Sequence, residues 1–68
     1  METFCKKLKE LRQEMGLTQK QLAEKLQTSN SAVCDWERGR TQPDLETLLA
    51  LAKFFKVSVD YLLGRKDY

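Results

Sequence analysis

The chain has 68 residues, enough for one domain and too few for a second. Hydrophobic residues make up 41% of it, which suits a folded globule rather than a disordered segment. Twelve Lys and Arg residues against ten Asp and Glu residues leave a formal charge of +2, and this balance by itself identifies no partner. No apolar run approaches the ~20 residues of a membrane span, and no signal peptide is recognisable, so we expect a cytoplasmic protein without a membrane partner.

The residues that carry catalysis or bind metals are scarce. The chain has no His, and its two cysteines, Cys5 and Cys34, are too few for a disulfide framework. A zinc site would need thiolate or carboxylate ligands at spacings that this sequence does not show. No nucleophile–base pair or carboxylate dyad is recognisable either. We therefore expect no metal, no cofactor and no enzymatic activity.

A first helix is predicted over residues 3–15. Apolar residues recur there at spacings of four, three and four, which place them on one helical face. Gly16 follows at the position where a helix end requires positive φ. The apolar face consists of Phe4, Leu8, Leu11 and Met15.

A second helix is predicted over residues 18–26, because its start has a dense capping signal. Thr18 can act as N-cap, and Gln21, three positions later, can complete a capping box. Leu17 and Leu22 stand on either side of that box, at the positions of a hydrophobic staple.

Three further helices are predicted over residues 29–38, 44–55 and 58–63. Ser29 and Asp44 are natural N-caps for the first two, and each of the first and third helices is followed by a glycine. The helix over 44–55 has an apolar stripe of Leu45, Leu48, Leu49, Ala52 and Phe55. The core is predicted to contain Leu8, Leu22, Val33, Trp36, Leu48 and Ala52.

The third helix combines an apolar and a polar face. At about 100° per residue, Val33 and Trp36 lie on the side that faces the core. The opposite side and its flanks carry Asn30, Ser31, Cys34, Asp35 and Arg38. Two helices with a tight link, the second with short polar side chains near its start, are typical of a helix-turn-helix that reads the DNA major groove. Any solvated helical bundle also shows a polar outer face, so periodicity alone leaves both interpretations open.

Three segments together carry a family resemblance: GLTQKQLAEKL, SNSAVCDWERGR and PDLETLLALAKFFKVSVDYLL. They resemble the helix-turn-helix domain of the Cro and phage-repressor (XRE-type) family, from about Phe4 to Leu63. The resemblance implies an all-α, compact five-helix bundle, a lambda-repressor-like DNA-binding domain over residues 1–68. Many phage repressors carry a further oligomerisation or cleavage domain, and we expect no self-cleavage here.

The resemblance also implies roles for individual residues. Asn30 and Ser31 would be the main base readers, with Asp35 and Cys34 extending the contact. Gln19 would bind a phosphate and also brace the first base-reading residue of the third helix. An ion pair between Arg12 and Glu37 would tie the first helix to the third. The full set of expected phosphate-binding residues is Thr18, Gln19, Ser29, Arg38, Arg40 and Thr41.

The sequence departs from the family in the link between the second and third helices. This turn commonly holds a glycine, whereas here it reads Gln27-Thr28. A side chain at that position is expected to be forced towards positive φ, with some strain.

The expected function is sequence-specific binding of double-stranded DNA as a bacterial or phage transcriptional regulator, a repressor, with the third helix in the major groove. A palindromic operator and a homodimer are expected, with Val59, Tyr61 and Leu63 as the dimer surface. The alternative is an antitoxin-like protein-interaction module that uses the fourth and fifth helices and binds DNA weakly. A binder of single-stranded RNA would need exposed aromatic side chains, which are assigned mostly to the core.

Overall fold

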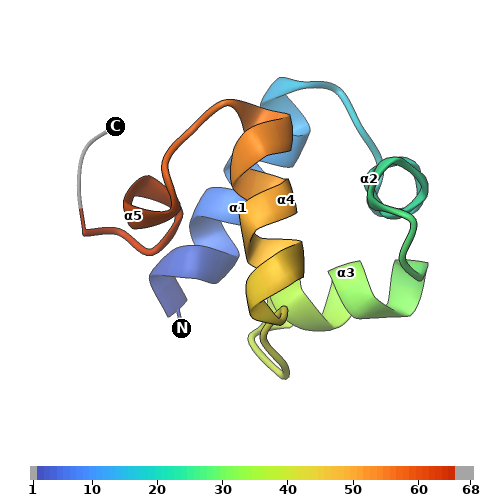
Figure 1. The fold of residues 1–68 in the computed structure, drawn as a ribbon. Coiled ribbons are helices and arrows are strands. Elements are labelled where there is room, and N and C mark those ends of the chain that lie inside the picture. The colour runs from blue at the N-terminus through green and yellow to red at the C-terminus, as the bar shows by residue number, and fades with distance from the viewer. Residues whose placement is uncertain (1, 66–68) are drawn as a thin grey trace.

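The computed structural model describes residues 2–65 and shows five helices and no strand within that range. They are α1 (Glu2–Glu14), α2 (Gln19–Leu26), α3 (Asn30–Arg38), α4 (Leu45–Phe55) and α5 (Val59–Leu62). In Figure 1, α4 lies in front of α1, with α2 and α3 on one side and α5 on the other. The predicted all-helical class is confirmed, and the ranges differ mainly because the predicted ones include the capping residues. No helix among the described residues has the length and apolar character to cross a membrane.

The helix starts follow the predicted caps. Before α2, the backbone N–H of Gln21 donates to Thr18 Oγ1 at 3.0 Å and the Thr18 N–H donates to Gln21 Oε1 at 2.8 Å, so both halves of the capping box are present. Before α4, Asp44 Oδ1 accepts from the Thr47 N–H at 2.8 Å. The hydrogen bonds that this carboxylate accepts from the side chain and backbone of Thr47 lower the pKa of Asp44.

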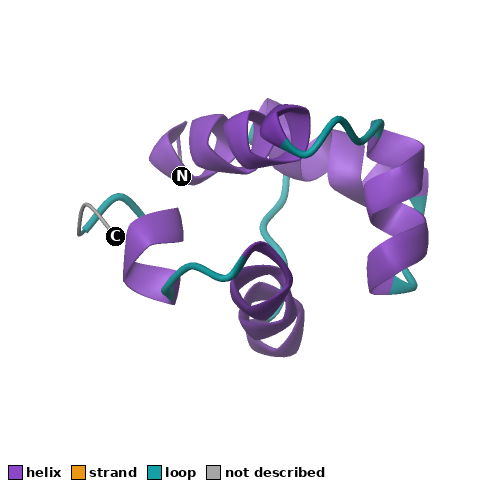
Figure 2. Ribbon diagram, turned by 90° about the horizontal axis from the view of Figure 1, so that it is seen from above, coloured by secondary structure: helices purple, strands orange, loops and turns teal. Residues whose placement is uncertain are grey.

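The core is built from buried side chains of all five helices. When the molecule is seen from above, the ribbons of α1 and α4 stand on opposite sides of the view (Figure 2). The buried side chains of the core are Phe4, Leu8, Leu22, Ala23, Val33, Trp36, Leu51, Ala52, Phe55 and Leu62. One predicted core residue, Leu48, is only half-buried and packs against the edge of this cluster.

The predicted apolar stripe of α4 is correct at Ala52 and Phe55, which are buried, and wrong at two of its leucines. Leu51, which the stripe left out, is fully buried, whereas Leu45 and Leu49 are 70% and 52% exposed. On a helix, Leu51 falls within about 60° of Leu48 and Phe55, while Leu45 and Leu49 fall about 90° and about 130° from the centre of those three residues. The apolar face of α1 is likewise shorter than predicted, because Met15 lies beyond the last residue of α1 and is exposed.

The positive φ predicted for the α2–α3 link is confirmed. Gln27 adopts φ 57° and ψ 43°, in the left-handed region, and its N–H bonds the carbonyl groups at the end of α2. Lys56 adopts nearly the same conformation at the end of α4, with φ 58° and ψ 42°. A residue other than glycine adopts the left-handed conformation at a cost of about 1–2 kcal/mol, because its Cβ approaches the following carbonyl oxygen.

Gln27→Gly is expected to raise the free energy of unfolding by about 0.5–1 kcal/mol, because relief of the left-handed strain outweighs the entropy that glycine adds to the unfolded chain. In thermal unfolding, the midpoint of the Gln27→Gly variant should lie a few degrees above that of the parent chain. Lys56→Gly is the matched variant and should behave alike, while Gln13→Gly, within α1, should destabilise the fold. A lower midpoint for Gln27→Gly contradicts the prediction.

Candidate nucleic-acid interface

The outer face of α3 is set by two buried anchors on its inner face. Val33 and Trp36 pack in the core and thereby fix the rotation of the helix about its axis. Asn30 and Ser31 are exposed in the first turn, and Cys34 is half-buried one turn later. These three side chains therefore lie side by side on the surface, with Asp35 half-buried and Arg38 exposed on the same arc.

The end of α3 adds a second cation to this surface. Gly39 adopts φ 77° and ends the helix, and the Arg40 N–H donates to the Asp35 carbonyl at 3.0 Å. The chain turns back there, and Arg38, Arg40 and Thr41 are all exposed. Two guanidinium groups thus stand within three residues of each other, a local positive charge that the small net charge did not reveal.

The helix starts next to this face carry hydroxyl groups that are already used in capping. Thr18 Oγ1 accepts from Gln21, and Ser29 Oγ accepts from the Ala32 N–H at 3.0 Å. The Thr18 N–H is also used, by Gln21 Oε1. A hydroxyl group that accepts one hydrogen bond can still donate another through its own proton. If Thr18 or Ser29 binds a phosphate as predicted, its hydroxyl must therefore act as the donor.

Beneath the start of α2 lies a polar network of three side chains from three helices. Arg12 Nε lies 2.7 Å from Glu37 Oε2, and Arg12 Nη2 lies 3.1 Å from Glu37 Oε1, so the structure contains the expected ion pair. The side chains are only 12% and 4% exposed. The hydrogen bonds that Arg12 donates to the Glu37 carboxylate raise the pKa of Arg12 above its already high ordinary value, which keeps the guanidinium charged.

The third member of this network, Gln19, is held differently from the prediction. Its Nε2 donates to Glu37 Oε1 at 3.1 Å. The family resemblance implied that this side chain braces the first base-reading residue of α3, which lies at the opposite end of that helix from Glu37. A hydrogen bond between residues 18 positions apart has no signal in a local sequence pattern, which is why sequence reasoning missed it.

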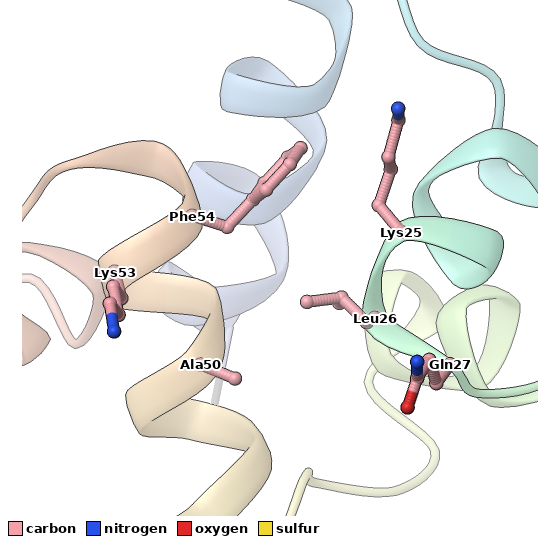
Figure 3. Close-up of a pocket in the computed structure, with 6 residues that line it drawn as sticks. All are labelled: Lys25, Leu26, Gln27, Ala50, Lys53 and Phe54. Atoms are coloured by element: carbon pink, nitrogen blue, oxygen red, sulfur yellow. The ribbon is translucent and has the colours of Figure 1, made fainter.

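A cleft of about 330 Å³ lies elsewhere, between the end of α2 and α4. Leu26 points from α2 across towards α4, and the amino groups of Lys25 and Lys53 point away from the centre (Figure 3). Gln27, Ala50 and Phe54 complete its lining. No lining residue belongs to α3, so we do not assign this cleft to the candidate interface.

The proposed dimer residues, two in α5 and one directly after it, are less exposed than the sequence suggested. Val59 packs against the core, and Leu63 is half-buried. Tyr61 is half-buried too, and Lys7 Nζ lies 4.6 Å from the centre of its ring, a cation–π contact between α1 and α5. Only parts of these three side chains remain for a partner.

Known proteins share both this sequence pattern and this fold. Residues 8–62 match a family model described as helix-turn-helix. The transcriptional regulator ImmR of Bacillus subtilis (strain 168) is 48% identical over 62 residues, which is 91% of this chain and 49% of its own length. The immunity repressor protein of Bacillus phage phi105 is 41% identical over 64 residues, covering 94% of this chain and 44% of its own. The chain thus spans about half the length of these relatives.

Among solved structures, the c2 repressor protein of phage P22, determined in complex with a synthetic operator, superposes with a TM-score of 0.86. The two sequences are 35% identical, and the match covers 93% of this chain and 96% of that one. The DNA-binding domain of the same repressor in solution gives a TM-score of 0.80 at 37% identity, covering 88% of this chain and 79% of that one. The fold and the family model agree, and the chain belongs to the helix-turn-helix family of Cro and phage-repressor (XRE) type.

Proposed function

We propose that the chain binds double-stranded DNA sequence-specifically and represses transcription in the cytoplasm of a bacterium, with α3 in the major groove. The observation that carries this proposal is the outer face of α3. Short polar side chains on a helix that is locked in rotation, joined to α2 by a tight turn, match the requirements of a recognition helix. The named relatives are regulators and repressors, and we propose no catalytic function.

Base reading is assigned to the start of α3. Asn30 has the donor and acceptor for a bidentate contact with adenine, and Ser31 can pair with either kind of group. Asp35, further along, would repel phosphate but can accept from the amino group of cytosine. Cys34 lies between them and offers a small side chain to a thymine methyl group. These roles rest on exposure and chemistry of the four side chains.

Phosphate binding is assigned to the residues around that helix. Arg38, Arg40 and Thr41 follow α3 in an exposed segment, where long side chains reach a DNA backbone. Gln19, Thr18 and Ser29 supply neutral donors at the starts of α2 and α3. The arginines would provide most of the affinity that is independent of sequence, because phosphate neutralisation releases counterions.

Arg40→Ala tests this assignment. We expect weaker binding to every duplex and a plot of log affinity against log salt that is flatter by about one unit, because one phosphate contact is lost. Fluorescence anisotropy with a labelled mixed-sequence duplex over a range of salt concentrations measures both. Lys9→Ala removes one positive charge from an exposed position on α1 and is the matched control. A salt slope unchanged by Arg40→Ala, or changed equally by Lys9→Ala, contradicts the assignment.

A symmetric pair of chains on a palindromic operator is the second part of the proposal, because a single domain reads too few base pairs for tight discrimination. The exposed parts of Val59, Tyr61 and Leu63 remain the proposed pairing surface. Sedimentation of the 7.9 kDa chain with saturating operator should show two chains per duplex. One chain per duplex at saturation rules out the dimer. Tight binding of a protein partner with only weak DNA binding would favour the protein-interaction alternative instead.

A further inference from the structure

The side chain of Gln19 is oriented by a charge pair before any DNA is bound. Gln19 is the first residue of α2 and is half-buried. Its Nε2 donates to Glu37 Oε1, the oxygen that also accepts from Arg12 Nη2, and both distances are 3.1 Å. The carboxylate of α3 therefore bridges a cation on α1 and an amide on α2.

The positive charge of Arg12 offsets the repulsion that the Glu37 carboxylate would otherwise exert on a DNA phosphate. An unpaired carboxylate near the start of α2 would repel a phosphate, but Arg12 contacts both oxygens of Glu37 and balances its charge. Arg12 Nη1 also donates to the Leu17 carbonyl at 2.7 Å, just before the cap of α2. Arg12 thus fixes the start of α2, while Glu37 fixes the side chain on its first residue.

The amide has a donor left for DNA. An amide nitrogen carries two N–H groups, and the bond to Glu37 uses one of them. A glutamine that is already ordered loses less conformational entropy on binding than a free one. On the basis of the proposed DNA-binding function, we propose that Glu37 is a positioning residue, which holds Gln19 so that its second N–H contacts a DNA phosphate.

A double-mutant cycle on DNA affinity tests this. With a labelled mixed-sequence duplex at low salt, Glu37→Leu should weaken binding by about three- to tenfold when Gln19 is present, the order expected for one hydrogen bond to a charged group. In a Gln19→Ala chain, the same change should weaken binding by less than about twofold, because no side chain is left to position. Since Gln19 is neutral, Gln19→Ala alone should weaken binding without changing the salt slope, unlike Arg40→Ala.

Affinities are corrected for the folded fraction, measured by circular dichroism under the same conditions. Leu51→Ala is the matched control: it opens the core at a residue of α4, which carries no member of the Arg12–Glu37–Gln19 network, and should change the affinity by the same factor in both chains. Where Glu37→Leu alone fails to fold, the paired variant R12M/E37L removes both charges and leaves neither unpaired.

A second measurement needs no variant with reduced stability. In the free parent chain, the Nε2 protons of Gln19 should exchange with water more slowly than those of Gln13, an exposed glutamine of α1. Equally fast exchange, or equal loss of affinity from Glu37→Leu with and without Gln19, overturns the inference while leaving DNA binding intact. A parent chain that binds no duplex overturns the proposed function, and the inference with it.

Discussion

Glu37→Ala is expected to lower the free energy of unfolding by about 3–5 kcal/mol, the usual cost of removing one partner from a buried ion pair. The carboxylate is only 4% exposed, and its loss leaves the Arg12 guanidinium without its partner in a site that is 12% exposed. Small domains have about 5–15 kcal/mol of total stability, so the variant should be close to unfolding at room temperature. Urea unfolding followed by circular dichroism measures the effect.

Two comparisons isolate the cause of that loss. Glu10→Ala removes an exposed carboxylate from α1 and should change stability by less than about 0.5 kcal/mol. The paired variant R12M/E37L should recover much of the loss, because neither charge is then buried alone. Among the folded molecules, base preference should be unchanged, since Glu37 faces the network rather than the outer side of α3. An unfolding midpoint equal to that of the parent contradicts the account of the pair.

Asn30→Ala is expected to remove discrimination at one base pair of each half-site, at a cost of about 1–3 kcal/mol there, while other positions keep their preference. Asn30 is the first residue of α3, exposed, and has the two hydrogen-bonding groups that adenine matches. Competition binding with duplexes that differ at single positions measures the change. Arg40→Ala is the matched comparison, because it should weaken all duplexes by a similar factor. If Asn30→Ala weakened all duplexes equally and Arg40→Ala changed the preference at one base pair, α3 would present a different face to DNA.

The helix starts were predictable because capping is a local property. An oxygen-bearing side chain followed by N–H donors within three residues determines the starts after Thr18, Ser29 and Asp44. The inner face of α3 was predictable for a similar reason, because Val33 and Trp36 are its only large apolar residues. The sequence therefore sufficed to identify which face of α3 is exposed.

The register of α4 could not be predicted in the same way. Its sequence, LETLLALAKFF, is apolar over so much of its circumference that a stripe through Leu45 and Leu49 fits the helical period as well as one through Leu51. Packing of α4 against the rest of the core decides between them. The left-handed Lys56 was recognisable in principle, because Lys56 and Val57 stand before the cap Ser58 as Gln27 and Thr28 stand before Ser29.

The most direct test of the central claim is selection of bound duplexes from a random-sequence DNA pool at near-physiological salt. We predict recovery of a palindrome whose half-site centres lie about one helical turn, ~10 bp, apart, as two chains with α3 in successive major grooves require. Recovery of no common sequence, with binding that disappears as salt is raised, would contradict sequence-specific recognition and leave only attraction between charges.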